Sequence, residues 1–341
     1  MNEWANKRIL ITGVSGTVGA ELLKQVLAHN PTEVIGIDNN ESELFFLDQH
    51  YQDQANVNLY LGDIRDKEKL TRMMQGIDIV LHAAALKHVM LCEKTPYDAV
   101  QTNILGTQHV IDAAIENDVQ RVVFTSSDKA VNPTNVMGTT KLMGERLMTA
   151  ANAQRRNSGP IFFSTRFGNI LGSRGSVIPI FKRQIVAGGP VTLTDPNMTR
   201  FIMTLEDAVS LVMQSVFIGC GGEVFVTKKP VVRIADLAQV MIDKLAPNPL
   251  EIQIQVIGNK PGEKLYEELM NDEEIRRTVE LPQYFSVLPA FKSVYETIHY
   301  AYADTASSNI SVAYNSSTQL PMTQQELADY LEKHNLLKDA A

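Results

Sequence analysis

Two ionisable side chains stand next to each other in TSSDKAVNPTNVMGTTK, residues 125–141. Asp128 and Lys129 could act as an acid and a base, and they follow an apolar run typical of a buried strand. A tyrosine four residues before Lys141 could take a hydroxyl proton, because the ammonium group would lower the pKa of the phenol. Met137 occupies that position, and a thioether cannot act as a base. A hydroxyl group oxidised at this site must therefore lose its proton by another route.

A glycine-rich turn could hold a phosphate group near these residues. In ITGVSGTVGAELLKQVL, glycines at G-x-x-G-x-x-G spacing join an apolar run to a helical pattern. The glycines let the main chain approach a pyrophosphate, and the helix N-terminus supplies amide donors and positive potential. We predict that a dinucleotide contacts Gly13, Ser15, Gly16, Thr17, Val18 and Gly19.

The second apolar run ends in a residue that selects the cofactor. Asp38 closes VIGID, where its carboxylate can accept hydrogen bonds from both ribose hydroxyls of adenosine. A 2′-phosphate would be repelled, and no arginine follows immediately, so NAD is favoured over NADP. The other predicted cofactor contacts are Asp63 and Ile64 near adenine, Ala83 and Ala84 after the fourth strand, and Lys141.

Short β-branched runs and amphipathic helical patterns alternate through the first half of the chain. The expected strands are residues 8–13, 33–38, 57–63, 78–84, 121–127 and 161–168. This alternation predicts right-handed crossovers and a Rossmann-like α/β fold with a doubly wound parallel sheet. We expect an NAD-binding domain at residues 1–168, with residues 205–226 packing back on it. Residues 169–341 should form a smaller C-terminal α/β domain that mainly binds the substrate.

Composition narrows the class of protein. The 341 residues carry a net charge of -8 without a Lys/Arg cluster, which argues against nucleic acid or an anionic membrane as the main partner. Cys92 and Cys220 have no metal-site or disulfide spacing, and we predict no metal site. The apolar runs are too short to span a membrane. We expect a soluble cytoplasmic protein.

The motifs resemble those of a known family. Residues 125–141, with HAAALKHV, RFGNILGSRGSVIPIFKRQI, TDPNMTRFIM and KPGEKLYEEL, are similar to nucleotide-sugar 4,6-dehydratases of the extended short-chain dehydrogenase/reductase family. UDP-N-acetylglucosamine 4,6-dehydratases match best, particularly the catalytic portion of the large membrane-anchored ones. The resemblance runs from about residue 8 to residue 270, and the sequence shows no counterpart of their membrane helices.

This resemblance implies a lyase with an internal redox reaction. Carbon 4 of the hexose is oxidised, water is lost across carbons 5 and 6, carbon 6 is reduced, and NAD ends each cycle unchanged. By position, Asp128 is the acid at the 6-hydroxyl and Lys129 is the base at carbon 5. Some family members carry methionine at the Met137 position. The 4-hydroxyl proton could pass to Asp128 directly, or through Ser127 or a water.

The charge state of the pair matters for its chemistry. An ionised Asp128 would raise the pKa of Lys129, and an amine acts as a base only when it is neutral. We therefore expect a protonated Asp128, so that the acid and the base prime each other as a coupled pair.

The later motifs are predicted to hold the sugar nucleotide. Lys87 and His88 follow the fourth strand and should face the sugar, although a single histidine can equally be structural. The resemblance places the other substrate contacts at Asn169, Ser176, Val177, Lys182, Arg200, Lys260, Glu263 and Lys264. Lys260 stands where relatives usually have arginine, so it keeps the charge and loses the bidentate fork.

The leading hypothesis is a UDP-N-acetylglucosamine 4,6-dehydratase that retains the configuration at carbon 5, which Met137 and the likeness to the membrane-anchored group favour. An inverting dehydratase and a UDP-sugar 4-epimerase are alternatives, and a non-catalytic NAD-binding scaffold is an alternative of another class. Asp128 and Lys129 argue against the scaffold. Amphipathic helices at residues 94–116 and 136–154 are consistent with a homo-oligomer, a dimer or larger.

Overall fold

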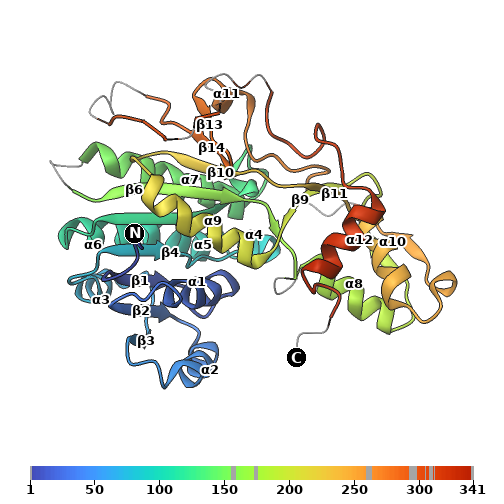
Figure 1. Ribbon diagram of the computed structural model, residues 1–341, viewed down its shortest axis with the longest axis horizontal. Coiled ribbons are helices and arrows are strands. Elements are labelled where there is room, and N and C mark those ends of the chain that lie inside the picture. Colours follow the sequence, from blue (N-terminus) through green and yellow to red (C-terminus); the bar gives the residue numbers. More distant parts are fainter. Residues whose placement is uncertain are drawn as a thin grey trace.

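The computed structural model describes residues 2–154, 159–172, 176–258, 263–291, 298–303, 305–306, 310 and 312–338. They form a large sheet-containing part and a smaller group of helices and short strands beside it (Figure 1). Among the described residues, no helix combines the length and the apolar character that crossing a bilayer would require. The predicted cytoplasmic location stays a prediction.

A mostly parallel sheet forms the centre of the larger part. Its strands are β1 (Arg8–Thr12), β2 (Glu33–Asp38), β3 (Val57–Leu61), β4 (Ile79–His82), β5 (Arg121–Ser127), β6 (Ile161–Phe167), β10 (Val224–Thr227), β13 (Thr278–Glu280) and β14 (Tyr284–Val287). Within the described residues, their order is β13-β14-β10-β6-β5-β4-β1-β2-β3. The strands from β3 to β10 run parallel, and β14 and β13 extend the sheet in antiparallel pairs. The predicted doubly wound, Rossmann-like sheet is confirmed.

Helices cover both faces of this sheet. The helices α1 (Thr17–Leu27), α2 (Glu41–Tyr51) and α9 (Leu205–Ile218) contribute to one apolar core. The helices α3 (Lys67–Met73), α6 (Gly106–Glu116) and α7 (Val136–Ala151) contribute to the other. Successive side chains of β1 point to opposite faces of the sheet, so Ile9 and Ile11 enter the first core and Leu10 enters the second. Both faces of the strands are therefore buried, which explains their nearly continuous apolar runs.

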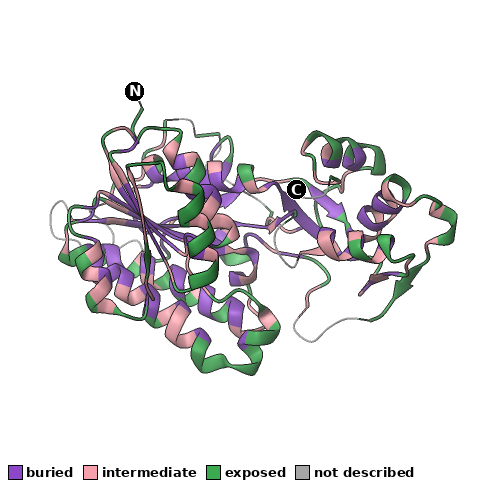
Figure 2. Ribbon diagram, turned by 90° about the horizontal axis from the view of Figure 1, so that it is seen from below, coloured by how far each residue is buried: buried purple, intermediate pink, exposed green. Residues whose placement is uncertain are grey.

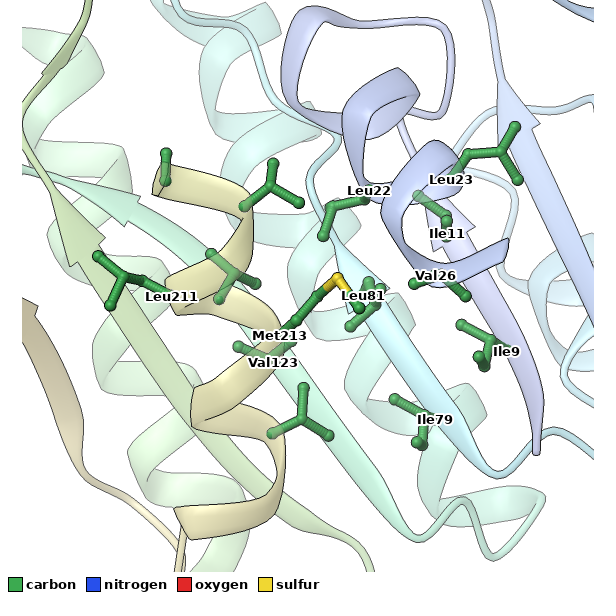
Figure 3. Close-up of a cluster of buried hydrophobic side chains, with 14 of the residues drawn as sticks. Ile9, Ile11, Leu22, Leu23, Val26, Ile79, Leu81, Val123, Leu211 and Met213 are labelled. Carbon is green, nitrogen blue, oxygen red and sulfur yellow. The ribbon is translucent and has the colours of Figure 1, made fainter. Parts of the chain in front are cut away.

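Helix α9 returns from the second half of the chain to pack beside α1. Figure 3 shows Leu211 and Met213 of α9 near Leu22 of α1, above the strands that carry Leu81 and Val123. The side chain of Thr204 caps α9 by accepting a hydrogen bond from the main-chain N–H of Asp207 at 3.0 Å. Each fully buried aliphatic side chain contributes about 1.5–3 kcal/mol of transfer free energy.

The smaller part has its own apolar core (Figure 2). Its helices are α8 (Val177–Val186), α10 (Ile234–Leu245) and α12 (Gln324–Lys333). Its strands are β7 (Asn169–Ile170), β8 (Val191–Leu193), β9 (Thr199–Met203), β11 (Val231–Arg233) and β12 (Ile254–Val256). Strands β11, β9 and β7 form one small sheet, and β12 and β8 form another. Because β10, β13 and β14 return to the large sheet, the domain boundary at residue 168 stays a prediction.

Short elements complete the description. They are α4 (Val89–Lys94), α5 (Pro96–Ala99), the π-helical turn η1 (Val100–Leu105), the 3₁₀ turns η2 (Asp128–Ala130), η3 (Asn152–Gln154) and η4 (Pro249–Glu251), and α11 (Asp272–Ile275). The π-helical turn runs directly into α6. Turn η2 continues directly from β5, so the carboxyl end of this central strand carries Asp128 and Lys129.

Candidate active site

The turn between β1 and α1 brings two main-chain segments unusually close together. Gly13 has a φ angle of +71°, and a Cβ atom there would lie 2.7 Å from the Ala84 main chain. Only glycine fits this position without displacing the neighbouring chain. In the described structure no side chain caps α1 at Gly16, so the first amides of the helix can meet an anion. The turn thus has the form that a bound pyrophosphate requires.

This turn borders a cavity of about 410 Å³, which we call the glycine-turn cavity. The Asp38 carboxylate lies in its wall and accepts hydrogen bonds from the main-chain N–H groups of Ser15 and Asn40, both at 3.0 Å. The cavity is lined by these predicted cofactor residues: Gly13, Ser15, Gly16, Thr17, Val18, Gly19, Asp38, Asp63, Ile64, Ala83 and Ala84. Sequence spacing had predicted that they would lie together, and the structure brings them together.

Lys87 and His88 also line the glycine-turn cavity. The sequence analysis expected them to face the sugar. The reason for their position is that β4 ends at His82, beside the glycine turn, so the segment that leaves this strand passes along the cavity first. Any contact of these two side chains with a sugar stays a prediction.

Lys141 lies deep in the protein on α7. Its ammonium group donates a hydrogen bond to the Thr125 carbonyl at 2.9 Å and lies 4.5 Å from the centre of the Phe124 ring. Burial lowers the pKa of Lys141 to about 8, against the opposing effect of the Glu145 carboxylate. The predicted contact of Lys141 with a nicotinamide ribose stays a prediction.

Met137 lies on the first turn of α7, where the phenol would have been. It is 5% exposed and packs in a small apolar cluster with Cys92 and Ala99. An apolar cluster is a favourable environment for a thioether and supplies no proton acceptor. The structure therefore provides no base at this position.

The end of β5 holds the acid and the amine in one ion pair. The Lys129 ammonium lies 3.0 Å from Asp128 Oδ2 and 3.2 Å from Oδ1. Ser127 donates its hydroxyl to Asp128 Oδ1 at 2.5 Å. The main chain of this turn packs so closely on α7 that a Cβ atom at Gly138 would lie 2.2 Å from the Lys129 carbonyl oxygen. The absence of a side chain at Gly138 thus allows the turn that carries Asp128 and Lys129 to pack directly on the helix.

A second cavity, of about 290 Å³, opens onto this pair, and we call it the Asp–Lys cavity. It is lined by Val89, Met90, Asp128, Lys129, Thr134, Asn135, Asn169, Arg200, Glu263, Lys264, Glu267 and Glu268. The two catalytic candidates thus share one space with four of the predicted substrate residues, Asn169, Arg200, Glu263 and Lys264. Among the described residues, no group of His, Cys, Asp and Glu is arranged to hold a metal ion.

Glu267 is a site residue that the sequence analysis missed. Its Oε1 atom lies 3.1 Å from Arg200 Nε and 3.7 Å from Lys129 Nζ, and accepts a hydrogen bond from Asn169 at 3.2 Å. The signal was present in KPGEKLYEEL, which the resemblance includes, but only its first residues were selected as contacts. Nothing in the local pattern distinguishes Glu267 from an exposed glutamate.

The protonation of the site differs from the expectation of a protonated Asp128. Burial would raise the pKa of Asp128, but the Lys129 ammonium and the hydrogen bonds with Glu267 and Ser127 outweigh burial and hold this pKa below its ordinary value. Burial and the Asp128 carboxylate raise the pKa of Glu267 to about 8. Burial lowers the pKa of Lys129, but the two carboxyl groups outweigh burial and raise it. The carboxyl group that keeps its proton near neutral pH is therefore Glu267.

A third cavity, of about 280 Å³, adjoins the Asp–Lys cavity, because Asn169, Arg200 and Glu263 line both. We call it the α8 cavity, since Ser176 and Val177 at the start of α8 also lie in its wall. Its other walls are mostly apolar and include Ile170, Leu171, Ile180, Phe181, Leu193, Met198, Ile234 and Ile257. Such a space suits a flat, partly apolar ring rather than a phosphate group.

The other predicted substrate lysines, Lys182, Lys264 and Lys260, differ in where they lie. Lys182 lies on α8 and donates a hydrogen bond to the carbonyl oxygen of Lys338 at 2.5 Å, on the outer side of the smaller part. Lys264 lies in the Asp–Lys cavity, where it bonds the Val131 carbonyl at 3.0 Å and Glu268 at 3.1 Å. Lys260 lies outside the described residues.

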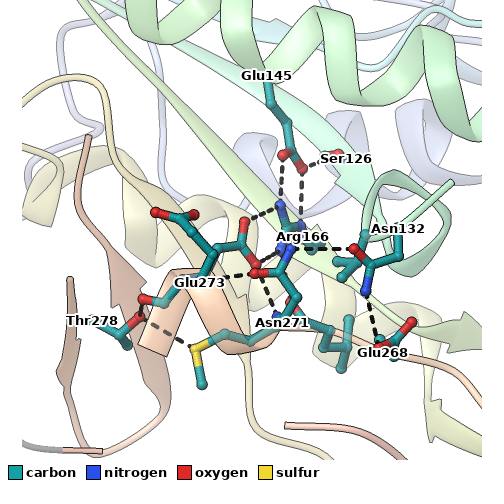
Figure 4. Close-up of polar contacts among 12 residues, drawn as sticks. Ser126, Asn132, Glu145, Arg166, Glu268, Asn271, Glu273 and Thr278 are labelled. Carbon is teal, nitrogen blue, oxygen red and sulfur yellow. Dashed lines mark hydrogen bonds and ion pairs between the residues drawn. The ribbon is translucent and has the colours of Figure 1, made fainter. Parts of the chain in front are cut away.

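A buried ionic network holds the Glu267 segment against the sheet (Figure 4). Arg166, at the end of β6, is 1% exposed and binds Glu145 of α7 and Glu274 of α11, with shortest distances of 2.6 Å and 3.1 Å. It also donates a hydrogen bond to the Leu269 carbonyl at 2.8 Å. Ser126, two residues before Asp128, donates its hydroxyl to Glu145 at 2.5 Å. The network therefore joins the end of β5 to the segment that carries Glu267.

The comparison with known families follows this geometry. A family model described as "Polysaccharide biosynthesis protein" matches residues 9–289, which is most of the chain. The chain belongs to this family. The predicted resemblance to extended short-chain dehydrogenase/reductase dehydratases is confirmed, and the protein is an enzyme of the nucleotide-sugar dehydratase and epimerase group.

Three similar proteins match most of the length of this chain. An uncharacterised membrane protein of Methanocaldococcus jannaschii is 43% identical over 340 residues, which cover 98% of both chains. A UDP-N-acetylglucosamine 4,6-dehydratase of Campylobacter jejuni, described as inverting, is 40% identical over 290 residues, covering 84% of each chain. The X-ray structure of Pen from Bacillus thuringiensis has a TM-score of 0.90 and 40% identity, and covers 98% of this chain and 100% of that one.

Proposed function

We propose that this protein is a UDP-N-acetylglucosamine 4,6-dehydratase that acts with bound NAD and retains the configuration at carbon 5. The observation that carries the proposal is the Asp128–Lys129 pair in the Asp–Lys cavity, which adjoins the α8 cavity and lies beside the glycine-turn cavity. The name of the Campylobacter jejuni relative supports the substrate and the reaction.

The residues of the glycine-turn cavity fit a dinucleotide. The close contact at Gly13 and the uncapped start of α1 suit the pyrophosphate, and the Asp38 carboxylate suits the hydroxyls of the adenosine ribose. When bound, NAD would take up a hydride from the sugar and give it back. Lys141, which is buried on α7, would supply positive charge near the reacting end.

Lys129 and Asp128 are suited to move protons. Lys129 is the base at carbon 5, where the 4-ketone makes the proton acidic. An amine is a base only in its neutral form, and uptake of the 4-hydroxyl proton by Asp128 removes an anion that raises the pKa of Lys129. Asp128 is ionised in the ion pair, so it can accept the 4-hydroxyl proton directly or through the Ser127 hydroxyl, which lies 2.5 Å away. This route supplies the base that Met137 cannot provide.

The α8 cavity and its junction with the Asp–Lys cavity would hold the uridine diphosphate. Asn169 and Arg200 line both cavities, so they could contact the diphosphate between uracil and hexose. Lys264 lies farther along and could approach the same charge. Ser176 and Val177 would contribute the main-chain amides at the start of α8.

Retention at carbon 5 rests on the amine. One group, Lys129, can remove and return the proton on the same face of the ring, whereas inversion needs a second donor on the opposite face. The relative described as inverting favours the other outcome, so inversion is the second candidate. A 4-epimerase would leave carbon 6 oxidised and would not need the Asp128–Lys129 pair.

The reaction in deuterated water tests the proposal. Incubated with UDP-N-acetylglucosamine, the protein should give a product lighter by one water, which NMR identifies as the 4-keto-6-deoxy sugar in the D-xylo configuration. An L-arabino product would show inversion and leave the dehydratase function standing. A product with the mass of the substrate would show epimerisation, and unchanged substrate would rule out the proposed function.

The preference for NAD gives a separate prediction. Protein denatured after purification should release NAD and not NADP, because the Asp38 carboxylate repels a 2′-phosphate. Asp38→Asn keeps the shape and removes the charge, so the ratio of the Kd values for NADP and NAD should fall about tenfold or more, as the loss of about 1.4 kcal/mol of discrimination implies. Release of NADP, or an unchanged ratio in the variant, would contradict this role of Asp38.

We also propose that the protein forms homo-oligomers. Large apolar side chains are exposed on the helices that the sequence analysis selected, including Tyr97, Leu105 and Met143. Exposed apolar residues on neighbouring helices are typical of surfaces that are covered by a second subunit. Light scattering of the purified protein measures the assembly directly.

A further inference from the structure

The turn η2, which carries the acid and the amine, is anchored at both ends. At its start, the Ser126 hydroxyl donates a hydrogen bond to the buried Glu145 at 2.5 Å, and this contact fixes the end of β5. At its end, the chain leaves η2 through Val131 and Asn132. The two ionisable side chains of η2 lie between these anchors, so their position depends on what holds Val131 and Asn132.

Asn132 has a left-handed backbone conformation, with a φ angle of +42°. Pro133 follows it, and a proline disfavours the right-handed helical conformation in the residue before it, so η2 does not continue as a helix through Asn132. Asparagine tolerates the left-handed region better than most residues do, and such conformations persist where neighbouring contacts fix them. The contacts of Asn132 thus set the course of the chain directly after η2.

A ring of contacts joins this part of the chain to residues that lie between 133 and 139 positions later (Figure 4). The Asn132 side-chain amide donates a hydrogen bond to Glu268 Oε1 at 3.1 Å, and the Lys264 ammonium donates to Glu268 Oε2 at 3.1 Å. Lys264 also donates to the Val131 carbonyl at 3.0 Å, which closes the ring. Asn271 donates to the Asn132 side-chain oxygen at 3.5 Å. Both polar atoms of the Asn132 side chain are therefore held by the later segment.

We propose that Asn132 is a positioning residue for the Asp128–Lys129 pair and acts by fixing the end of η2 to Glu268, an inference that rests on the proposed dehydratase function. The Val131 main-chain N–H donates a hydrogen bond to the Asp128 carbonyl at 3.0 Å, so the segment that Glu268 holds is bonded directly to η2. Proton transfer is sensitive to the position of the reacting groups, and a displacement of about 1 Å can cost about 10²-fold in rate.

The location of Asn132 separates positioning from binding and from folding. Glu268 and Lys264 are among the described residues that line the Asp–Lys cavity, and Asn132 is not. A substitution of Asn132 therefore reaches the reaction through η2 and not through contact with the sugar. Asn132 is also exposed, and exposed contacts with a charged group contribute little to the free energy of unfolding. An effect on the rate without an equal effect on stability is thus the signature of positioning.

Asn132→Asp tests this role because aspartate keeps the size of the side chain and also tolerates a left-handed backbone. The amide donor becomes an oxygen that faces the Glu268 carboxylate, so attraction becomes repulsion. We expect kcat for water loss to fall by about 10²-fold, as for a displaced catalytic group. The KM for UDP-N-acetylglucosamine, the amount of bound NAD and the Tm should change much less. In deuterated water, entry of deuterium at carbon 5 should slow together with kcat, because Lys129 is displaced.

The double variant Asn132→Asp/Glu268→Gln exchanges the donor and the acceptor of the contact. The amide at position 268 can then donate to the carboxylate at position 132, which restores the hydrogen bond in the opposite direction. We expect the double variant to be faster than Asn132→Asp, whereas independent effects at the two positions would make it no faster. Glu268→Gln alone should have the smaller effect, because its amide oxygen can still accept a hydrogen bond from Asn132.

Asn248→Asp is the matched control. Asn248 precedes η4 in the smaller part, is exposed, and also donates its side-chain amide to a glutamate, Glu251, at 2.7 Å. Its substitution introduces the same repulsion between two carboxylates away from η2. The kcat of this variant should equal that of the wild type.

Two results would overturn this inference and leave the dehydratase function standing. An unchanged kcat in Asn132→Asp, with or without a lower Tm, would mean that the contact has at most a structural role. A double variant no faster than Asn132→Asp would mean that Asn132 does not act through Glu268. A wild type that releases no water would overturn the proposed function, and this inference with it.

Discussion

Lys129→Ala is expected to lower the rate of dehydration by about 10²–10⁴-fold, because it removes the only amine placed at the end of β5 to take the carbon 5 proton in the described structure. Deuterium should no longer enter carbon 5 of the substrate. The amount of bound NAD should change little, since the glycine-turn cavity is lined by other residues. Lys244→Ala removes a lysine that pairs with Glu332 far from these cavities, and should leave the rate unchanged.

Asp128→Asn completes this experiment by removing the partner of the same ion pair. The carboxylate that receives the 4-hydroxyl proton is lost, so formation of the 4-keto sugar should slow as well as water loss. Lys129→Ala should still form that ketone, which is the difference that identifies the two roles. Near-normal turnover of either variant, with a Tm close to that of the wild type, would remove the substituted residue from the mechanism.

Arg166→Met is expected to lower the free energy of unfolding by about 3–5 kcal/mol, because it leaves the carboxylates of Glu145 and Glu274 buried without their cation. Urea denaturation at pH 7 measures the change. Arg233→Met removes an exposed arginine that lies 3.7 Å from Asp236, and should cost no more than about 1 kcal/mol.

The pH dependence of the free energy of unfolding lost in Arg166→Met tests whether the unpaired carboxylates cause this loss. In the wild type, burial acts to raise the pKa of Glu274, but the Arg166 guanidinium outweighs burial and holds this pKa below its ordinary value of 4.5. The stabilisation from the ion pair is therefore lost only as the pH falls through that lowered pKa. In Arg166→Met the unpaired buried carboxylates bind protons more tightly than in the unfolded chain, so the variant gains stability as the pH falls. The difference between the two proteins should therefore narrow toward acid pH. A difference independent of pH would point to lost packing instead.

The parallel sheet could be predicted from local patterns because each strand carries its own signal. The runs at residues 33–38 and 121–127 were expected with the bounds of β2 and β5, since both strands are buried on both faces and carry uninterrupted apolar residues at 34–37 and 122–124. Helix α10, with the sequence IADLAQVMIDKL, carries a local signal of the same kind, because its apolar residues recur at helical spacing. The glycine turn was predictable because glycines at this spacing indicate that two main-chain segments lie close together.

The contacts that complete the candidate site depend on residues far apart in the chain. Arg166 and Glu274 are separated by 108 residues, and no local periodicity records that they meet. The acid form of Glu267 arises from burial and from the Asp128 carboxylate, which fold topology alone brings close, so the local sequence KLYEEL does not record it. Strands β13 and β14 were missed because short antiparallel strands late in the chain lack the alternation with helices that marks the earlier ones.

The residues that line the glycine-turn cavity and those that line the Asp–Lys cavity are completed at different times during translation. All residues that line the glycine-turn cavity lie between Gly13 and Thr102, whereas the wall that carries Glu267 is contributed by residues 263–268. A growing chain therefore contains every residue that lines the glycine-turn cavity before Asp128 and Lys129 are translated, and long before the segment that carries Glu267.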